Sequence, residues 1–165
     1  MPRRFSMFNS PRSQQAQDCT RELYLHTSNQ DWLLRLCNDI AAEKDEEKRG
    51  ELKKRLPVIT WQAAFDGKRL AKEAKPSGLF MLDIDHVDEP GKLYNENVAG
   101  RIKELGIVYV GMTASRHGLR IVAKCKPDLK TIEECQMWLA SNLKVEYDGV
   151  CKEIEIGRAS CRERV

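Results

Sequence analysis

The chain has 165 residues, the length of one domain with a core of its own. Hydrophobic residues make up 41% and charged residues 32% of it, and the formal net charge is +3, too small to indicate nucleic-acid binding by itself. No apolar run approaches a membrane span and the first residues lack the apolar centre of a signal peptide, so we expect no membrane partner.

Six cysteines are present, and none of them lies in the Cys-x-x-Cys spacing typical of metal sites. Without a secretion signal they are expected to be reduced thiols, which favours a cytoplasmic protein.

Residues 1–20 are polar and rich in Ser, Gln and Pro, so we expect a disordered N-terminal segment. A helix is predicted from Ser28 onward, capped by Ser28 or Asn29. Four apolar residues form its stripe: Trp32, Leu33, Leu36 and Ile40. The charged run that follows to Arg55 predicts a solvated second helix after a break near Gly50, ended by Pro57.

Beyond that run, apolar periodicity predicts strands at 58–65, 78–85, 107–112 and 119–125. A helix face ending at Gly106 is marked by Tyr94, Val98, Ile102 and Leu105. A second one, opened by Thr131 or Asp128, is marked by Ile132, Cys135, Leu139 and Leu143. A last strand is expected near Val150. The order predicts an α+β, ferredoxin-like or RRM-like split βαβ core over 21–155, with helices on one sheet face and the other face open for a site.

The last residues are expected to be non-native. Glu155 to Val165 reads EIGRASCRERV, which is the translation of DNA resembling a short-read sequencing adapter. We therefore exclude 156–165 from fold reasoning and expect the domain to be incomplete at its C-terminus.

The sharpest chemical signal is GLFMLDIDHV, in which Asp83 and Asp85 end a strand with only Ile84 between them. Alternation along a strand places both carboxylates on one face. Like charges this close repel one another, and a divalent metal is the usual compensation. The pattern predicts a Mg²⁺ or Mn²⁺ site.

Further polar residues are expected to converge on this sheet edge. Ser115, His117 and Arg120 lie in or next to the turn between two strands, and Asp148 follows the second helix. Carboxylates holding a metal, beside cationic and hydroxyl groups, suit a nucleoside triphosphate. Each piece has a plainer interpretation, because an Asp-x-Asp at a strand end is common and turn residues are often solvated surface.

The same residues resemble a known family. The segments KKRLPVITWQAAFDGKRL, SGLFMLDIDHV, ASRHGLRIV and VEYDGVCKE are similar to the VirE N-terminal domain family of primase-like proteins, within the archaeo-eukaryotic primase superfamily. The resemblance runs from Leu52 to Glu153. It implies primer synthesis or extension on DNA during replication of a chromosome or mobile element, with Asp83, Asp85 and Asp148 as catalytic metal ligands. It also implies a helicase-like domain C-terminal to this chain.

The second motif of that resemblance can be aligned in two ways. Read as Ser-x-His, it assigns Ser115 and His117 to the nucleotide; anchored on the following strand, it assigns Arg120. We expect Arg120 to share the face of Asp83 together with Val122, and Leu119 and Ile121 to face the core. A non-catalytic nucleic-acid or partner-binding module and a metal-dependent nuclease remain as alternatives.

Overall fold

Three antiparallel strands form the central sheet, in the order β6-β8-β7. Their bounds are Leu79–Asp85 for β6, Ile107–Met112 for β7 and Gly118–Lys124 for β8. Both β6 and β7 run antiparallel to β8, so they are parallel to each other and separated by it. This is the split βαβ arrangement that the sequence predicted, and the protein is α+β.

The computed structural model describes residues 5–147 and 149. Asp148, the strand expected near Val150 and the segment 156–165 lie outside the described residues.

The connection from β6 to β7 is helical but broken into short pieces. They are α4 (Pro90–Leu93), the π-helical η2 (Tyr94–Val98), the 3-10 η3 (Ala99–Arg101) and α5 (Ile102–Leu105). Pro90 occupies the first turn, where its missing N–H costs nothing. Gly106 ends the connection with a left-handed φ of 67°, as predicted.

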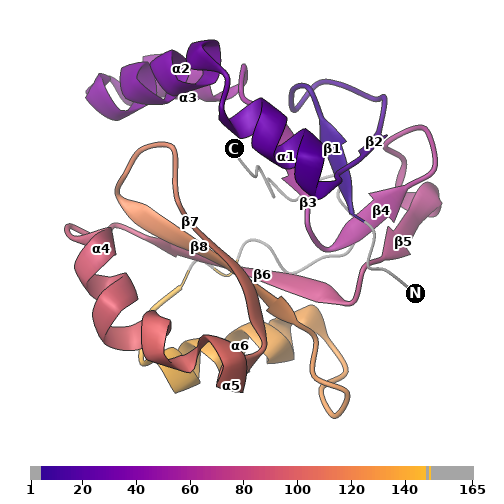
Figure 1. Ribbon diagram of the computed structural model, residues 1–165, viewed down its shortest axis with the longest axis vertical. Helices are drawn as coiled ribbons and strands as arrows, with labels where there is room; N and C mark the ends of the chain where they lie inside the picture. The colour runs from indigo at the N-terminus through magenta and orange to yellow at the C-terminus, as the bar shows by residue number, and fades with distance from the viewer. Residues whose placement is uncertain (1–4, 148, 150–165) are drawn as a thin grey trace.

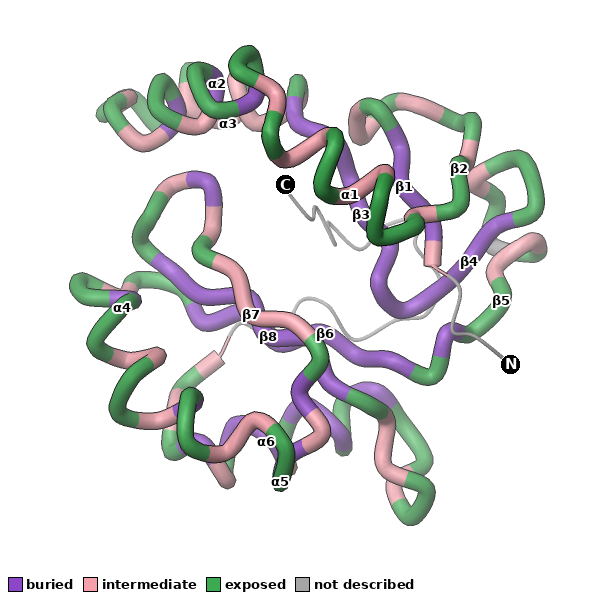
Figure 2. The backbone as a smooth tube through the Cα atoms, viewed as in Figure 1, coloured by how far each residue is buried: buried purple, intermediate pink, exposed green. Residues whose placement is uncertain are grey.

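The helix α6 (Ile132–Leu143) begins at Thr131 with a reciprocal capping box to Glu134. Its predicted apolar face, Ile132, Cys135, Leu139 and Leu143, is buried. Together with the β6–β7 connection, α6 covers one face of the central sheet (Figure 1). The main core therefore lies between these helices and the strands β6 and β8. Most residues of both strands are buried (Figure 2).

The opposite face of the sheet is covered as well. The remaining strands are β1 (Ser6–Phe8), β2 (Gln17–Asp18), β3 (Val58–Thr60), β4 (Ala63–Phe65) and β5 (Ala74–Pro76). Met7 and Ile59 from this N-terminal part pack with Met81 and Val122 of the central sheet in a second buried cluster. The expectation of an open face was therefore wrong, because strands distant in sequence fold over it.

Two further expectations about the N-terminal half are corrected. Residues 6–8 are not disordered, because β1 is buried and pairs with β2 and β3 in a sheet of its own. The strand predicted over 58–65 is two strands, since the chain turns at Trp61 and Gln62: β3 pairs with β1, and β4 pairs with β5. A short 3-10 turn, η1 (Ala71–Glu73), precedes β5.

Three helices complete this half: α1 (Arg21–Ser28), α2 (Asp31–Ala42) and α3 (Glu46–Lys53). Leu33, Leu36 and Ile40 of the predicted stripe are buried, but Trp32 is 48% exposed. The break between α2 and α3 lies at residues 43–45, where Asp45 caps α3, and not at Gly50, which is inside α3. The N-terminal cap of α2 is Gln30, so neither Ser28 nor Asn29 opens it.

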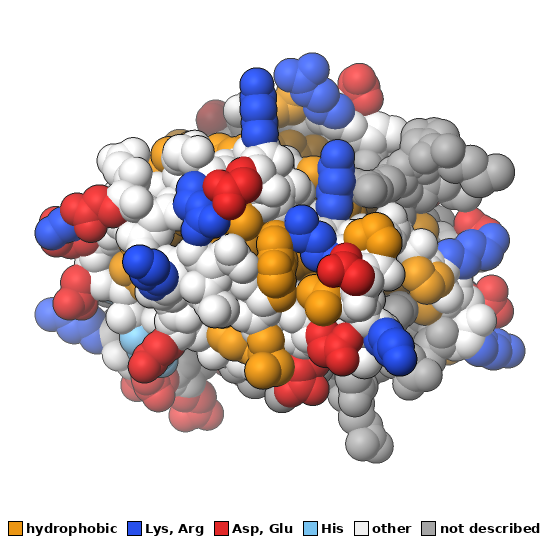
Figure 3. All heavy atoms as spheres, turned by 90° about the horizontal axis from the view of Figure 1, so that it is seen from below, with side chains coloured by type: hydrophobic (Ala, Val, Ile, Leu, Met, Phe, Trp, Pro, Cys, Tyr) orange, Lys and Arg blue, Asp and Glu red, His pale blue; other side chains and the backbone are white. Residues whose placement is uncertain are grey.

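None of the helices in the described part of the chain combines the length and apolarity needed to cross a bilayer. Figure 3 shows acidic and basic side chains interspersed on the face seen from below. On that face, contact with a charged ligand would depend on local groups and not on a field of one sign.

Candidate active site at the end of β6

Asp83 and Arg120 face each other across the β6–β8 pair. The Nε of Arg120 donates to Oδ1 of Asp83 at 2.5 Å, and a terminal guanidinium nitrogen donates to Oδ2. Both residues are buried, with 8% and 7% of their surfaces exposed. The charge of Asp83 is thus compensated by a bidentate arginine, the strongest of the side-chain ion-pair geometries.

The predicted faces of β8 are confirmed. Val122 packs in the cluster shared with the N-terminal strands, whereas Ile121 packs against the helices. Arg120 therefore leaves β8 on the face of Asp83, as expected. Its guanidinium, however, is directed to a carboxylate of its own chain, so in this arrangement it is committed to Asp83.

Asp85 is exposed at the end of β6, opposite Gly118. A Cβ on Gly118 would lie 2.5 Å from the carbonyl oxygen of Ile84 and 3.0 Å from Oδ1 of Asp85. Only glycine allows the two backbones to approach this closely. Because Gly118 has no side chain, the start of β8 can pack closely against the carboxylate of Asp85.

A polar cleft of about 420 Å³ opens beside Asp85. It is lined by Glu46, Arg49, Lys53, Asp85, His86, Asp88, Ser115 and His117. These residues come from α3, from the chain that follows β6, and from the β7–β8 turn. Two carboxylates and two imidazoles from the β6 end and the turn thus share one cleft with two cations of α3, although the segments are distant in sequence.

Hydrogen bonds connect the segments that form the walls of this polar cleft. The backbone N–H of Val87 donates to the carbonyl of His117 at 2.9 Å, which joins the β6 end to the turn. Arg116 reaches across to Oδ1 of Asn38 on α2. Both His86 and Arg116 have left-handed φ angles, 56° and 63°, a conformation that costs non-glycine residues energy and concentrates at functional sites.

A family model described as BT4734-like, N-terminal domain, matches residues 51–156, more than half of the chain. The chain belongs to this family. That finding corrects the resemblance drawn from the motifs, because the BT4734-like N-terminal domain is a different family from the VirE N-terminal one and lends no support to membership of the primase superfamily. No curated protein and no solved structure matches the chain.

In this BT4734-like domain, the predicted site residues divide into two groups. Asp85, Ser115 and His117 line the polar cleft. Asp83 and Arg120 are buried as an ion pair on β6 and β8, and neither lines the cleft. Ser115 is close to Thr113, with 3.3 Å between the two hydroxyl oxygens.

Five cleft residues were missed by sequence reasoning: Glu46, Arg49, Lys53, His86 and Asp88. The charged run over α3 was interpreted as a solvated face. A signal was nevertheless present, because Arg49 and Lys53 are four residues apart and so share one face of the helix. Arg49 is anchored there by Glu46 at 3.5 Å and by the carbonyl of Glu43 at 3.4 Å.

Among the described residues, no three His, Cys, Asp or Glu side chains are placed to hold a metal ion. A metal caged by protein ligands alone therefore does not fit this part of the domain. Mg²⁺, however, is commonly bound through one or two carboxylates together with substrate phosphates and water. Asp85 and Asp88, both exposed in the polar cleft, fit that second mode, whereas the oxygens of Asp83 are occupied by Arg120.

Proposed function

We propose that the polar cleft binds a nucleoside triphosphate with Mg²⁺ or Mn²⁺, and that the domain transfers nucleotides to a DNA primer. The supporting observation is the placement of Arg49 and Lys53 of α3 opposite Asp85, Asp88 and His117 in one cleft. Cations bind the phosphate oxygens, and carboxylates bind the metal that accompanies them. A cleft lined by both cations and carboxylates does not suit an apolar ligand or a simple cation.

The bound metal ion would neutralise charge that develops on the triphosphate during transfer. The residues of the chain then have distinct roles. Lys53 and Arg49 bind the outer phosphates, and Asp85 binds the metal ion, which holds the triphosphate at the end of β6. Ser115 and His117, in the turn, are positioned to donate hydrogen bonds to phosphate oxygens. A primer 3′-hydroxyl would form the new bond to the α-phosphorus as pyrophosphate departs.

The buried pair of Asp83 and Arg120 supports this chemistry indirectly. Because Arg120 already neutralises Asp83, the strand can present Asp85 without placing two uncompensated carboxylates on one face. Asp83 therefore serves as a positioning residue. This differs from the role expected from the motif alone, in which both residues bind the metal.

Two alternatives from other classes lead to different measurements. A metal-dependent nuclease would need metal and DNA but no triphosphate. A non-catalytic module would bind nucleic acid or a protein partner, such as a helicase-like domain, without turnover. The α3 cations favour a phosphate-rich ligand in the polar cleft, and triphosphate binding separates the first function from the nuclease.

Calorimetric titration with a non-hydrolysable nucleoside triphosphate, with and without Mg²⁺, tests the binding step. Lys53→Ala is expected to weaken affinity about ten- to a hundredfold, the value of one charged contact of about 1.5–3 kcal/mol. Lys130→Ala, an exposed lysine before α6, is the matched control. His117→Ala is paired in the same way with His26→Ala on α1. Equal affinity of Lys53→Ala, His117→Ala and wild type contradicts the site.

Primer extension on a DNA template tests the transfer step. Asp85→Asn is expected to abolish extension while leaving binding of the metal-free triphosphate within a few-fold of wild type. Triphosphate binding without extension by the wild-type chain would favour the non-catalytic module. Cleavage of DNA without triphosphate binding would favour the nuclease.

We also propose a cytoplasmic location. The four described cysteines, Cys19, Cys37, Cys125 and Cys135, form no disulfide with one another, which suits a reducing compartment.

A further inference from the structure

The strand β7 is an uncharged edge of the central sheet. In the part of the chain that the structure describes, β7 pairs only with β8. Its sequence IVYVGM contains no charge and no proline, the devices by which edge strands commonly prevent association. A bulge between Ile107 and Tyr109 disturbs only its first residues.

The direction of the backbone groups on β7 follows from hydrogen bonds elsewhere in the sheet. On β6, the N–H of Met81 donates to Gln62 Oε1, and its carbonyl accepts from Gln136 Nε2, so both groups point away from β8. Met81 and Val122 are therefore a pair without mutual hydrogen bonds. The N–H and carbonyl groups of Val122 consequently point away from β6, toward β7.

The other end of the sheet agrees with this assignment, because the N–H of Thr113 donates to the carbonyl of Gly118. Even-numbered residues of β8 thus bond to β7, and Tyr109 and Gly111 receive those bonds. Val110 and Met112 consequently direct their N–H and carbonyl groups outward, away from β8. These two residues offer four main-chain groups to a further strand.

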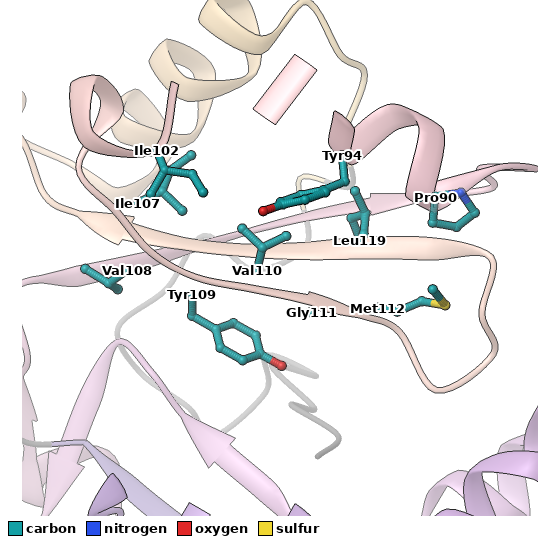
Figure 4. A pocket seen from close by; sticks show the side chains of 11 residues that line it. Pro90, Tyr94, Ile102, Ile107, Val108, Tyr109, Val110, Gly111, Met112 and Leu119 are labelled. Carbon is teal, nitrogen blue, oxygen red and sulfur yellow. The ribbon is translucent and has the colours of Figure 1, made fainter. Parts of the chain in front are cut away.

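An apolar groove of about 370 Å³ runs beside this edge. It is lined by all of β7 and by residues of the helical connection, including Pro90, Tyr94 and Ile102. Figure 4 shows Val110 and Leu119 on the same side of the sheet as Tyr94, and Tyr109 on the opposite side. A strand added to β7 would therefore place alternate side chains over the groove.

We propose that a second copy of this chain occupies the edge, through antiparallel pairing of β7 with β7 about a two-fold axis at Val110. The strand is self-complementary in this register, because Val108 and Met112 lie two residues on either side of Val110 and are 47% and 52% exposed. In this register Val108 of each copy would lie opposite Met112 of the other. An uncharged strand creates no like-charge repulsion with itself. The inference is independent of the nucleotide site.

Sedimentation equilibrium over a wide range of concentrations tests the proposal. The wild-type chain is expected to form a reversible dimer. Met112→Lys is expected to weaken dimerisation at least about tenfold, since a lysine on the edge must be desolvated in the paired state. Met137→Lys, at a 57% exposed methionine on α6, is the matched control and should dimerise as wild type does. Val108→Lys provides a second variant on the edge itself.

Amide hydrogen exchange gives a readout that needs no substitution. The amides of Val110 and Met112 should exchange more slowly as concentration rises, whereas those of Tyr109 and Gly111, already bonded to β8, should not change. A chain that stays monomeric at every concentration overturns the proposal and assigns the edge to another occupant. A dimer that Met112→Lys and Val108→Lys leave intact overturns it too, because the interface then lies elsewhere.

Discussion

Arg120 stands directly opposite Asp83 across the β6–β8 pair and bonds to both of its carboxylate oxygens. The close spacing of Asp83 and Asp85 raised the question of what compensates their charge. For Asp83 the answer in this structure is an arginine 37 residues away in the sequence. The charge of Asp83 is thus neutralised inside the sheet, and of the two carboxylates only Asp85 is exposed.

Asp83→Asn is therefore expected to destabilise the fold. Removing one partner of a buried pair leaves the other charge without compensation, which costs about 3–5 kcal/mol. Urea denaturation followed by circular dichroism measures the loss, and Asp88→Asn, an exposed carboxylate, should change stability by less than about 0.5 kcal/mol. Relief of the repulsion between Asp83 and Asp85, which the sequence alone predicts, would instead stabilise the fold, and that result would contradict the ion pair.

The coupling between the two residues can be measured directly. Arg120→Met alone leaves Asp83 buried without its partner, whereas the double variant Asp83→Leu with Arg120→Met removes both charges. We expect the double variant to be more stable than Arg120→Met and less destabilised than the sum of the two single changes. Additive losses in the double-mutant cycle would show that the pair is not energetically coupled.

Gly118→Ala is expected to destabilise the hairpin. The new Cβ would lie 2.5 Å from the carbonyl oxygen of Ile84, a backbone atom that cannot swing aside, and overpacking of this kind costs about 1–3 kcal/mol. Gly50→Ala is the matched control, because α3 leaves open space there and alanine should stabilise the helix by about 0.5–1 kcal/mol. Thermal unfolding of both variants compares them. A neutral Gly118→Ala would mean that β6 and the turn are not in close contact.

A surface pair predicts a pH dependence. The side-chain hydrogen bond from Arg101, followed by the attraction of its charge, holds the pKa of Glu104 below its usual value of 4.5. A carboxyl whose pKa is lowered by folding stabilises the protein above its unfolded-state pKa, and that stabilisation is lost as the pH falls through the folded-state pKa.

The stability difference between wild type and Glu104→Gln should therefore be complete at neutral pH and should close as the pH falls below about 4.5. Urea titrations at a series of pH values measure it, and Glu96→Gln, in the same helical connection, supplies the background. A difference that stays constant down to strongly acidic pH would contradict the pairing.

Local periodicity was sufficient for the central sheet and its helices. Alternation over Leu79–Asp85 and Gly118–Lys124 fixed which side chains face the helices, because a one-residue slip would expose the whole apolar set. The face of α6 and the left-handed Gly106 were predicted for the same reason, since their signals lie within one turn of the chain.

What could not be predicted depends on pairing over long distances. Met7 pairs with Ile59, and nothing in either short segment identifies the other as its partner. For this reason the sequence predicted disorder where β1 and β2 form, and an open face where the sheet is covered. The cations of the polar cleft were missed on the same ground, because α3 faces Asp85 only after the N-terminal half has folded over the sheet.

The N-terminal boundary of the folded unit differs from that of the family match. The family match begins at residue 51, but the cluster over Met81 and Val122 is completed by Met7 from β1. A polypeptide cut at the family boundary would expose that apolar face to water and would lose the central strand of the sheet β2-β1-β3. The segment that the family model matches is thus shorter than the unit that folds, and the longer unit sets the smallest piece on which the site can be studied.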